Sequence, residues 1–166
     1  GTGTTTIGGA VNTNTAAGVS LTGTDIAVNQ GITTTGNGVV TLNGSGTLAI
    51  AAAGDITAAG AVDLTASTIS TAGNITTSAD NITFNSPTVL TGNVTLNSAG
   101  GDIGFGSTLR GTTAGVENLT LTAGIKNIFD TDPPFTAHNL DFAAGAGWDP
   151  RVADPRGRAF TFLASY

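Results

Sequence analysis

Gly54-Asp55-Ile56-Thr57 returns as Gly73-Asn74-Ile75-Thr76 and again as Gly92-Asn93-Val94-Thr95. The step is 19 residues each time, and it keeps a glycine, an acid or amide, a β-branched residue and a threonine in the same order. A fixed period of about 20 residues with β-branched content is the signature of a solenoid, in which each repeat buries its apolar face only against its neighbours. The stretch from Gly54 to Leu96 therefore indicates the fold of the whole chain.

A second recurring signal is a three-residue apolar–polar–apolar strand that returns every 20 to 22 residues. Alternation along a strand sends its outer two side chains to one face and the middle one to the other. We therefore expect an interior column of third residues and an outward column of middle residues. The interior column is Leu21, Leu42, Leu64, Phe84 and Phe105, the outward one is Ser20, Thr41, Asp63 and Thr83, and a sixth strand of this face is expected at Leu119-Thr120-Leu121.

Two more apolar segments fall within each period, so each coil is predicted to hold three short strands. One set contains Ile26-Ala27-Val28 and Leu48-Ala49-Ile50, and the other is the glycine-led phrase itself. Strands of neighbouring coils would pair in parallel, about 4.8 Å apart. The prediction is an all-β parallel β-helix with 19–22 residues per coil and about six coils.

The polar residue of the glycine-led phrase has a predicted structural role. Asn and Asp tolerate left-handed backbone and cap neighbouring amides. Because Asp55, Asn74 and Asn93 recur at one position of the phrase, we expect them to form a hydrogen-bonded ladder at the turns.

Composition restricts the class of protein and its partners. Only 10% of the 166 residues are charged, 39% are apolar, the formal net charge is −6, and the chain has no cysteine. Low charge with β-branched content argues against a disordered chain. One lysine and four arginines are too few cations for nucleic acid or an anionic lipid surface. We therefore expect no nucleic-acid partner, and since no apolar run is long enough to span a bilayer, no membrane insertion.

The composition changes near Lys126, and this divides the chain into two predicted parts. Residues 1–126 are the coils, with 1–18 as an N-terminal edge or cap segment or an incomplete first coil. Residues 127–166 hold five of the seven phenylalanines and the only Trp and Tyr. Because aromatic residues are enriched at interface centres, this segment is predicted either to dock on a neighbouring subunit or to cap its own solenoid. The predicted assembly interface is Phe129, Phe135, Phe142, Trp148, Phe160, Phe162 and Tyr166.

The recurring Gly-Asn-Ile-Thr, Val-Thr-Leu-Asn and Gly-Asp-Ile phrases resemble the coils of filamentous-haemagglutinin-like and autotransporter-like bacterial surface proteins. The resemblance covers roughly residues 19–125. It implies a right-handed parallel β-helix that is secreted and displayed on the cell surface. It also implies a role as an adhesin, a fibre or surface-layer material.

No catalytic, metal or cofactor site is predicted. The acids are spread at about one per coil, and the densest polar set, Asp130, Asp132, His138 and Asp141, is interpreted as a solvated loop. The expected function is that of a non-enzymatic extracellular structural subunit, a homo-polymer joined head to tail into a fibre, sheath or adhesin stalk. The alternatives are an adhesin fragment that binds surface glycans and, less favoured, an enzyme acting on polysaccharide.

Overall fold

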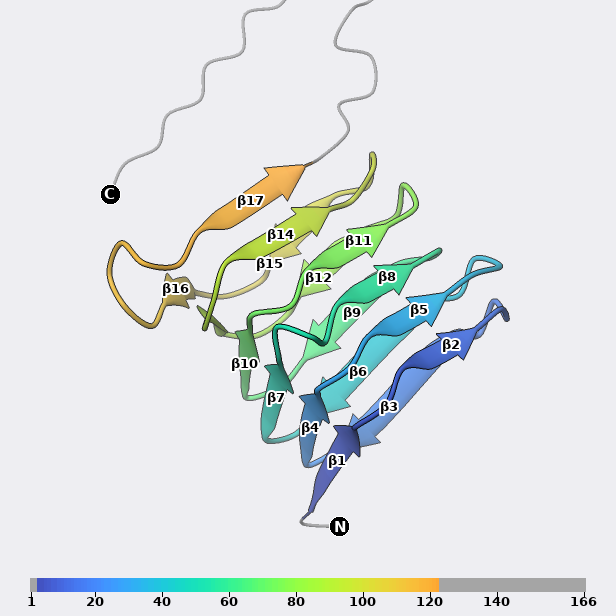
Figure 1. The fold of residues 1–166 in the computed structure, drawn as a ribbon, viewed down its shortest axis with the longest axis horizontal. Coiled ribbons are helices and arrows are strands. Elements are labelled where there is room, and N and C mark those ends of the chain that lie inside the picture. The colour runs from blue at the N-terminus through green and yellow to red at the C-terminus, as the bar shows by residue number, and fades with distance from the viewer. Residues whose placement is uncertain (1–2, 123–166) are drawn as a thin grey trace, which may run out of the picture. The chain divides into compact units, whose positions relative to one another are not determined.

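The structure is a computed structural model that describes residues 3–122, and within this range it contains strands and no helix. The strands form three parallel sheets, which we name A, B and C (Figure 1). Sheet A contains β1 (Thr4–Ile7), β4 (Asp25–Val28), β7 (Thr47–Ile50), β10 (Thr68–Thr71), β13 (Thr88–Leu90) and β16 (Leu109–Gly111). Sheet B contains β2 (Val11–Thr13), β5 (Ile32–Thr34), β8 (Ile56–Ala58), β11 (Ile75–Thr77), β14 (Val94–Asn97) and β17 (Leu119–Thr122). Sheet C contains β3 (Val19–Gly23), β6 (Val40–Gly44), β9 (Val62–Thr65), β12 (Ile82–Phe84) and β15 (Ile103–Phe105).

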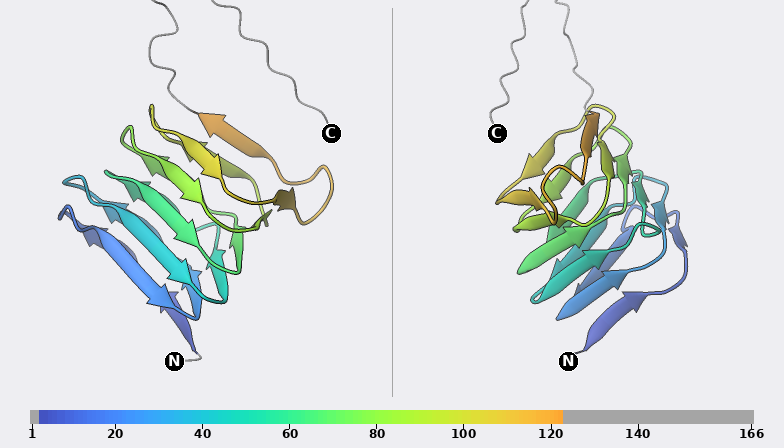
Figure 2. Two further views of the ribbon diagram at one scale, coloured as in Figure 1. Left: turned by 180° about the vertical axis from the view of Figure 1, so that it is seen from behind. Right: turned by 60° about the vertical axis from the view of Figure 1, so that its left-hand side comes forward.

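The chain visits the three sheets in the repeating order A, B, C, so each coil is one strand of each sheet. The parallel register joins residues 19 to 25 positions apart, from Ile56 with Ile75 to Val94 with Leu119. In Figure 1 sheet B lies in front and runs to the upper right, sheet C returns behind it, and successive coils advance to the upper left. That is the sense of a right-handed coil, so the predicted right-handed parallel β-helix is confirmed. Seen from behind, the strands of sheet C face the viewer (Figure 2).

The predicted interior column of sheet C is confirmed. Leu21, Leu42, Leu64, Phe84 and Phe105 are paired in register through all five strands. The three central side chains of this column are fully buried, whereas Leu21 and Phe105, at its two ends, are only partly buried. The rings of Phe84 and Phe105 stack with their centroids 4.8 Å apart, which is the spacing of the strands that carry them.

Sheets A and B contribute matching columns, and together the three sheets enclose one apolar core. In sheet B the column runs from Val11 through Ile32, Ile56 and Ile75 to Leu96 and Leu121. All four of its central members, from Ile32 to Leu96, are less than 2% exposed. Each strand has room for only one or two inward side chains, so the core is continuous along the stack and thin across it.

Six hydroxyl side chains within residues 3–122 are also buried, and each of them makes a hydrogen bond. Thr34 Oγ1 donates to Gly38 O at 2.5 Å, and Ser98 Oγ donates to Gly101 O at 2.5 Å. A buried hydroxyl without a partner would cost roughly 1–3 kcal/mol, and here the corner backbone supplies the partner. The whole set is Thr34, Thr71, Thr77, Ser86, Thr88 and Ser98.

The sixth strand expected in sheet C belongs to sheet B, so this prediction is wrong. β17 pairs with β14, with Leu119 beside Val94 and Leu121 beside Leu96. The 16 residues that separate Ile103 from Leu119 are fewer than one coil requires. They carry the chain across sheet A and into sheet B, which is an advance of two faces instead of three.

The sequence leaves two roles open for the segment 1–18, an N-terminal edge or cap segment and an incomplete first coil. Residues 4–13 of this segment form the first two strands of the stack. β1 pairs with β4 and β2 pairs with β5. The corner that follows them requires a glycine. Gly18 has a φ of +62°, and a β-carbon on it would lie 1.9 Å from the backbone oxygen of Val39 in the next coil. Only a residue without a side chain allows the two coils to approach so closely here.

Candidate functional site

Side-chain oxygens at the corners tie successive coils together. Asp55 Oδ1 accepts the Asn74 N–H at 2.7 Å, and Asn74 Oδ1 accepts the Thr95 N–H at 2.8 Å. Each of these bonds crosses from one coil to the next at the corner that precedes sheet B. A side-chain oxygen can therefore satisfy a backbone donor where the ladder of the sheet has not yet begun.

Asn93 occupies a different position from the one that the repeat predicts. Ile75 pairs with Leu96 and not with Val94, so the third phrase lies two residues out of register with the second. Asn93 consequently does not meet Asn74, and its Oδ1 accepts the Asn118 N–H at 3.0 Å in the following coil. A shift of two residues keeps every side chain on its own face, which is why sheet B tolerates it.

Two further corner contacts follow the same rule and are not indicated by the glycine-led phrase. Asp25 Oδ1 accepts both the N–H of Thr47 at 2.7 Å and its hydroxyl at 2.9 Å. Asn81 Oδ1 accepts the Asp102 N–H at 2.8 Å. The hydrogen bonds from Thr47, first from its backbone and then from its side chain, lower the pKa of Asp25. The usable sequence signal is an Asp or Asn directly before a strand or at its first position, about one coil ahead of the donor.

The corner between β16 and β17 is built differently. It takes residues 112–118, against three to five residues at the other described corners between sheets A and B. Glu117 closes it by accepting the hydroxyl of Thr112 and the N–H of Thr113, the latter at 3.1 Å to Oε2. The hydroxyl of Thr112 is the main cause of a lowered pKa for Glu117.

The two ends of the described stack are open. Within residues 3–122, β1, β2 and β3 have a strand on one side only, and so do β15, β16 and β17. At the C-terminal end Leu109 is 38% exposed and Leu121 is 53% exposed, although both continue inward columns. At the N-terminal end Val11 and Leu21 are partly buried. Each end therefore combines unpaired backbone with apolar side chains, a combination that favours addition of further strands.

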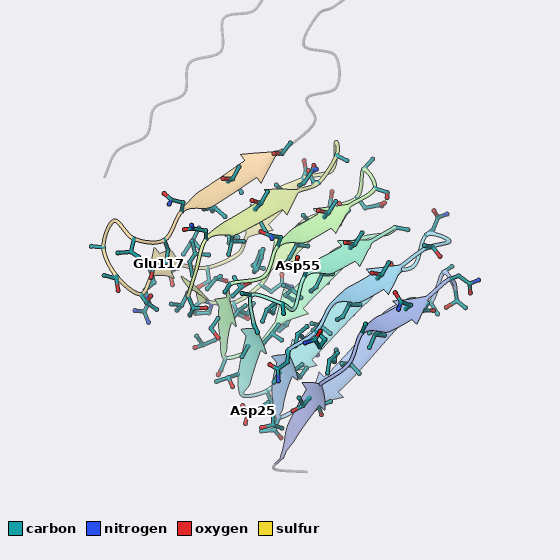
Figure 3. The ribbon with its side chains drawn as sticks, viewed as in Figure 1. Asp25, Asp55 and Glu117 are labelled. Atoms are coloured by element: carbon teal, nitrogen blue, oxygen red, sulfur yellow. The ribbon has the colours of Figure 1, made fainter. Side chains whose placement is uncertain are left out.

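The carboxylates do not gather into a catalytic or metal-binding group in the part of the chain that the structure describes. Figure 3 shows Asp25, Asp55 and Glu117 well apart on the stack. Residues 3–122 contain no group of three or more His, Cys, Asp or Glu side chains able to hold a metal ion, and no helix there is long and apolar enough to cross a membrane.

The predicted aromatic interface and the polar set from Asp130 to Asp141 lie outside the described residues. Of the predicted site residues, only those of the turn ladder, Asp55, Asn74 and Asn93, fall within the described residues. Asp55 and Asn74 are hydrogen-bonded to each other, whereas Asn93 accepts a hydrogen bond from Asn118 in the following coil and Asn74 accepts one from Thr95. No protein-family model matches the chain, and no curated protein or solved structure was found to be similar to it.

Proposed function

We propose that the protein is an extracellular structural subunit that joins end to end into a fibre, sheath or adhesin stalk. The observation that carries the proposal is that, within residues 3–122, the strands at both ends of the stack have a neighbour on one side only, with exposed apolar side chains at the C-terminal end and partly buried ones at the N-terminal end. The extracellular location rests on the likeness of the repeat phrases to bacterial surface proteins.

The two ends match each other because the cross-section repeats from coil to coil. The interior column of sheet B begins at Val11 and ends at Leu121. A second copy stacked on the C-terminal end would set its Val11 above Leu121 and continue that column. Such a contact joins two different surfaces of the same chain, so it does not close and instead propagates into an open filament.

Sheet C has five described strands whereas sheets A and B have six. An end-to-end joint therefore leaves a place for one more strand above β15. In the proposed joint the segment 127–166 provides the additional contacts, through Phe129, Trp148 and the other aromatic residues assigned to assembly, by adding a strand or by docking in a groove.

The test is electron microscopy of the full chain and of two variants in β17. Leu121→Lys places a charge on the inward column at the exposed end, and Thr120→Lys is the matched control because Thr120 faces outward on the same strand. We expect filaments from the wild type and from Thr120→Lys, and single particles with an unchanged circular dichroism spectrum from Leu121→Lys. Single particles from the wild-type chain at high concentration would rule out self-assembly. Filaments from Leu121→Lys would exclude this end as the joint.

A further inference from the structure

The outer face of sheet B carries a compact polar array in its first two coils. Asn12 on β2 pairs in register with Thr33 on β5. The Thr35 N–H donates to Thr13 O at 2.9 Å, which extends the same register one residue further. Because side chains alternate, Asn14 and Thr35 form the next outward pair. Two amides therefore lie over two hydroxyls, at roughly 4.8 Å between strands and about 7 Å along them.

This array borders a hollow of about 430 Å³, lined by Asn12, Thr13, Asn14, Thr33 and Thr35. We name it the sheet B groove. The hollow is wide open to solvent and is not an enclosed cavity. The groove lies on the outward face of sheet B, over the end strand β2 and its neighbour β5, whereas the inward column through Val11 that the proposed joint would use faces the opposite side of β2.

The groove offers hydrogen-bonding side chains that have no hydrogen-bond partner within residues 3–122. The side chains of Asn12, Asn14 and Thr33 make no hydrogen bond to any other residue in the described part of the chain. Each amide presents one acceptor oxygen and two N–H donors, and each hydroxyl both donates and accepts. The remaining two residues are less free, since the hydroxyl of Thr13 pairs with Thr15 and that of Thr35 lies 3.5 Å from Thr13 O.

The chemistry of these groups selects a class of ligand. All five lining residues are neutral, so no charge is present to hold an ion or a phosphate. A planar amide sets a donor and an acceptor side by side, which complements two adjacent hydroxyl groups that each donate and accept. We propose that the sheet B groove binds a neutral oligosaccharide through the amides of Asn12 and Asn14 and the hydroxyl of Thr33.

The expected affinity is weak. The only aromatic side chains among the described residues, Phe84 and Phe105, belong to the interior column of sheet C, so no ring within residues 3–122 can stack on a sugar in this groove. An open site that relies on hydrogen bonds exchanges them with water for a small net gain. A dissociation constant in the millimolar range is expected for one groove.

The test is saturation-transfer difference NMR on the full chain, with maltotriose, cellotriose and chitotriose as neutral probes. The method observes the sugar and works for single molecules and for filaments, so its result is separable from that of the assembly test. We expect transfer to at least one of these sugars, and a loss of about tenfold or more in affinity for the double variant Asn12→Ala/Asn14→Ala. The matched control is Thr57→Ala/Thr76→Ala, which removes outward hydroxyls of the same sheet outside the groove and should leave binding unchanged.

Three results would overturn the proposal. One is the absence of transfer to all three sugars at about 10 mM, a concentration that would populate a millimolar site. Another is unchanged binding in the Asn12→Ala/Asn14→Ala variant, with its fold verified by circular dichroism. Trigalacturonate, a trisaccharide of similar size with three carboxylates, should bind more weakly than the best neutral probe, and tighter binding of it would also contradict a groove selected for neutral ligands.

Discussion

Replacing Leu42 by alanine tests whether the thin core is as tightly packed as its columns imply. Leu42 is fully buried between Leu21 and Leu64, which lie in register on the neighbouring strands. The substitution removes three carbons, worth about 2.4 kcal/mol at roughly 0.8 kcal/mol each. Because backbone ladders on both sides fix the neighbours, the cavity should collapse little, and its cost brings the expected loss to about 3–4 kcal/mol.

The matched control is the same substitution at Leu21, the partly buried end of the same column. Leu21→Ala removes less buried surface and has a strand on one side only, so we expect it to cost about half as much. Equilibrium urea unfolding of the full chain, followed by far-ultraviolet circular dichroism and checked for reversibility by dilution, measures both losses. A loss below about 1 kcal/mol for Leu42→Ala, or equal losses at the two positions, would refute a core built from closely packed columns.

Three further predictions concern the corners. Gly18→Ala should lower the free energy of unfolding by at least about 2 kcal/mol in urea titrations, because the new β-carbon adds left-handed strain and overlaps the next coil. The hydrogen bonds from Thr47 lower the pKa of folded Asp25, so their stabilisation is present above the ordinary pKa of 3.8 and is lost as the pH falls through the lowered value. Asp25→Asn keeps the acceptor oxygen but does not titrate, and its thermal midpoint should fall less than that of the wild type between pH 6 and pH 2; an identical fall would exclude Asp25 as a source of acid sensitivity. Asn74→Ala removes the acceptor for the Thr95 N–H, and hydrogen exchange at that amide should accelerate by roughly 2- to 12-fold, equivalent to about 0.5–1.5 kcal/mol, while unchanged exchange would show that this ladder contact does not protect the corner.

The fold could be predicted from the sequence because a solenoid repeats its local pattern. The column from Leu21 to Phe105 follows from alternation within each strand and from one spacing, and neither requires knowledge of a distant contact. Prediction of the site was less complete. Thr34 and Ser98 lie two residues after the inward Ile32 and Leu96, so alternation places them on the inner face, but nothing local shows that a corner carbonyl lies within reach of their hydroxyls.

The register between coils was decided only by the tertiary structure. The sequence by itself determined that strands of about three residues recur, which side chains face inward, and that glycine and Asx residues form the corners. It did not determine that five residues separate Leu90 from Leu96 where three separate their partners Thr71 and Ile75, which moves Asn93 away from Asn74, or that the chain reaches sheet B at Leu119. The physical reason is that hydrophobic burial depends on the face a side chain occupies, and a shift of two residues leaves every face unchanged. The packing of whole coils therefore selects among registers that the sequence pattern permits equally, and only that packing sets Asn12 and Asn14 over the hydroxyls of the next strand.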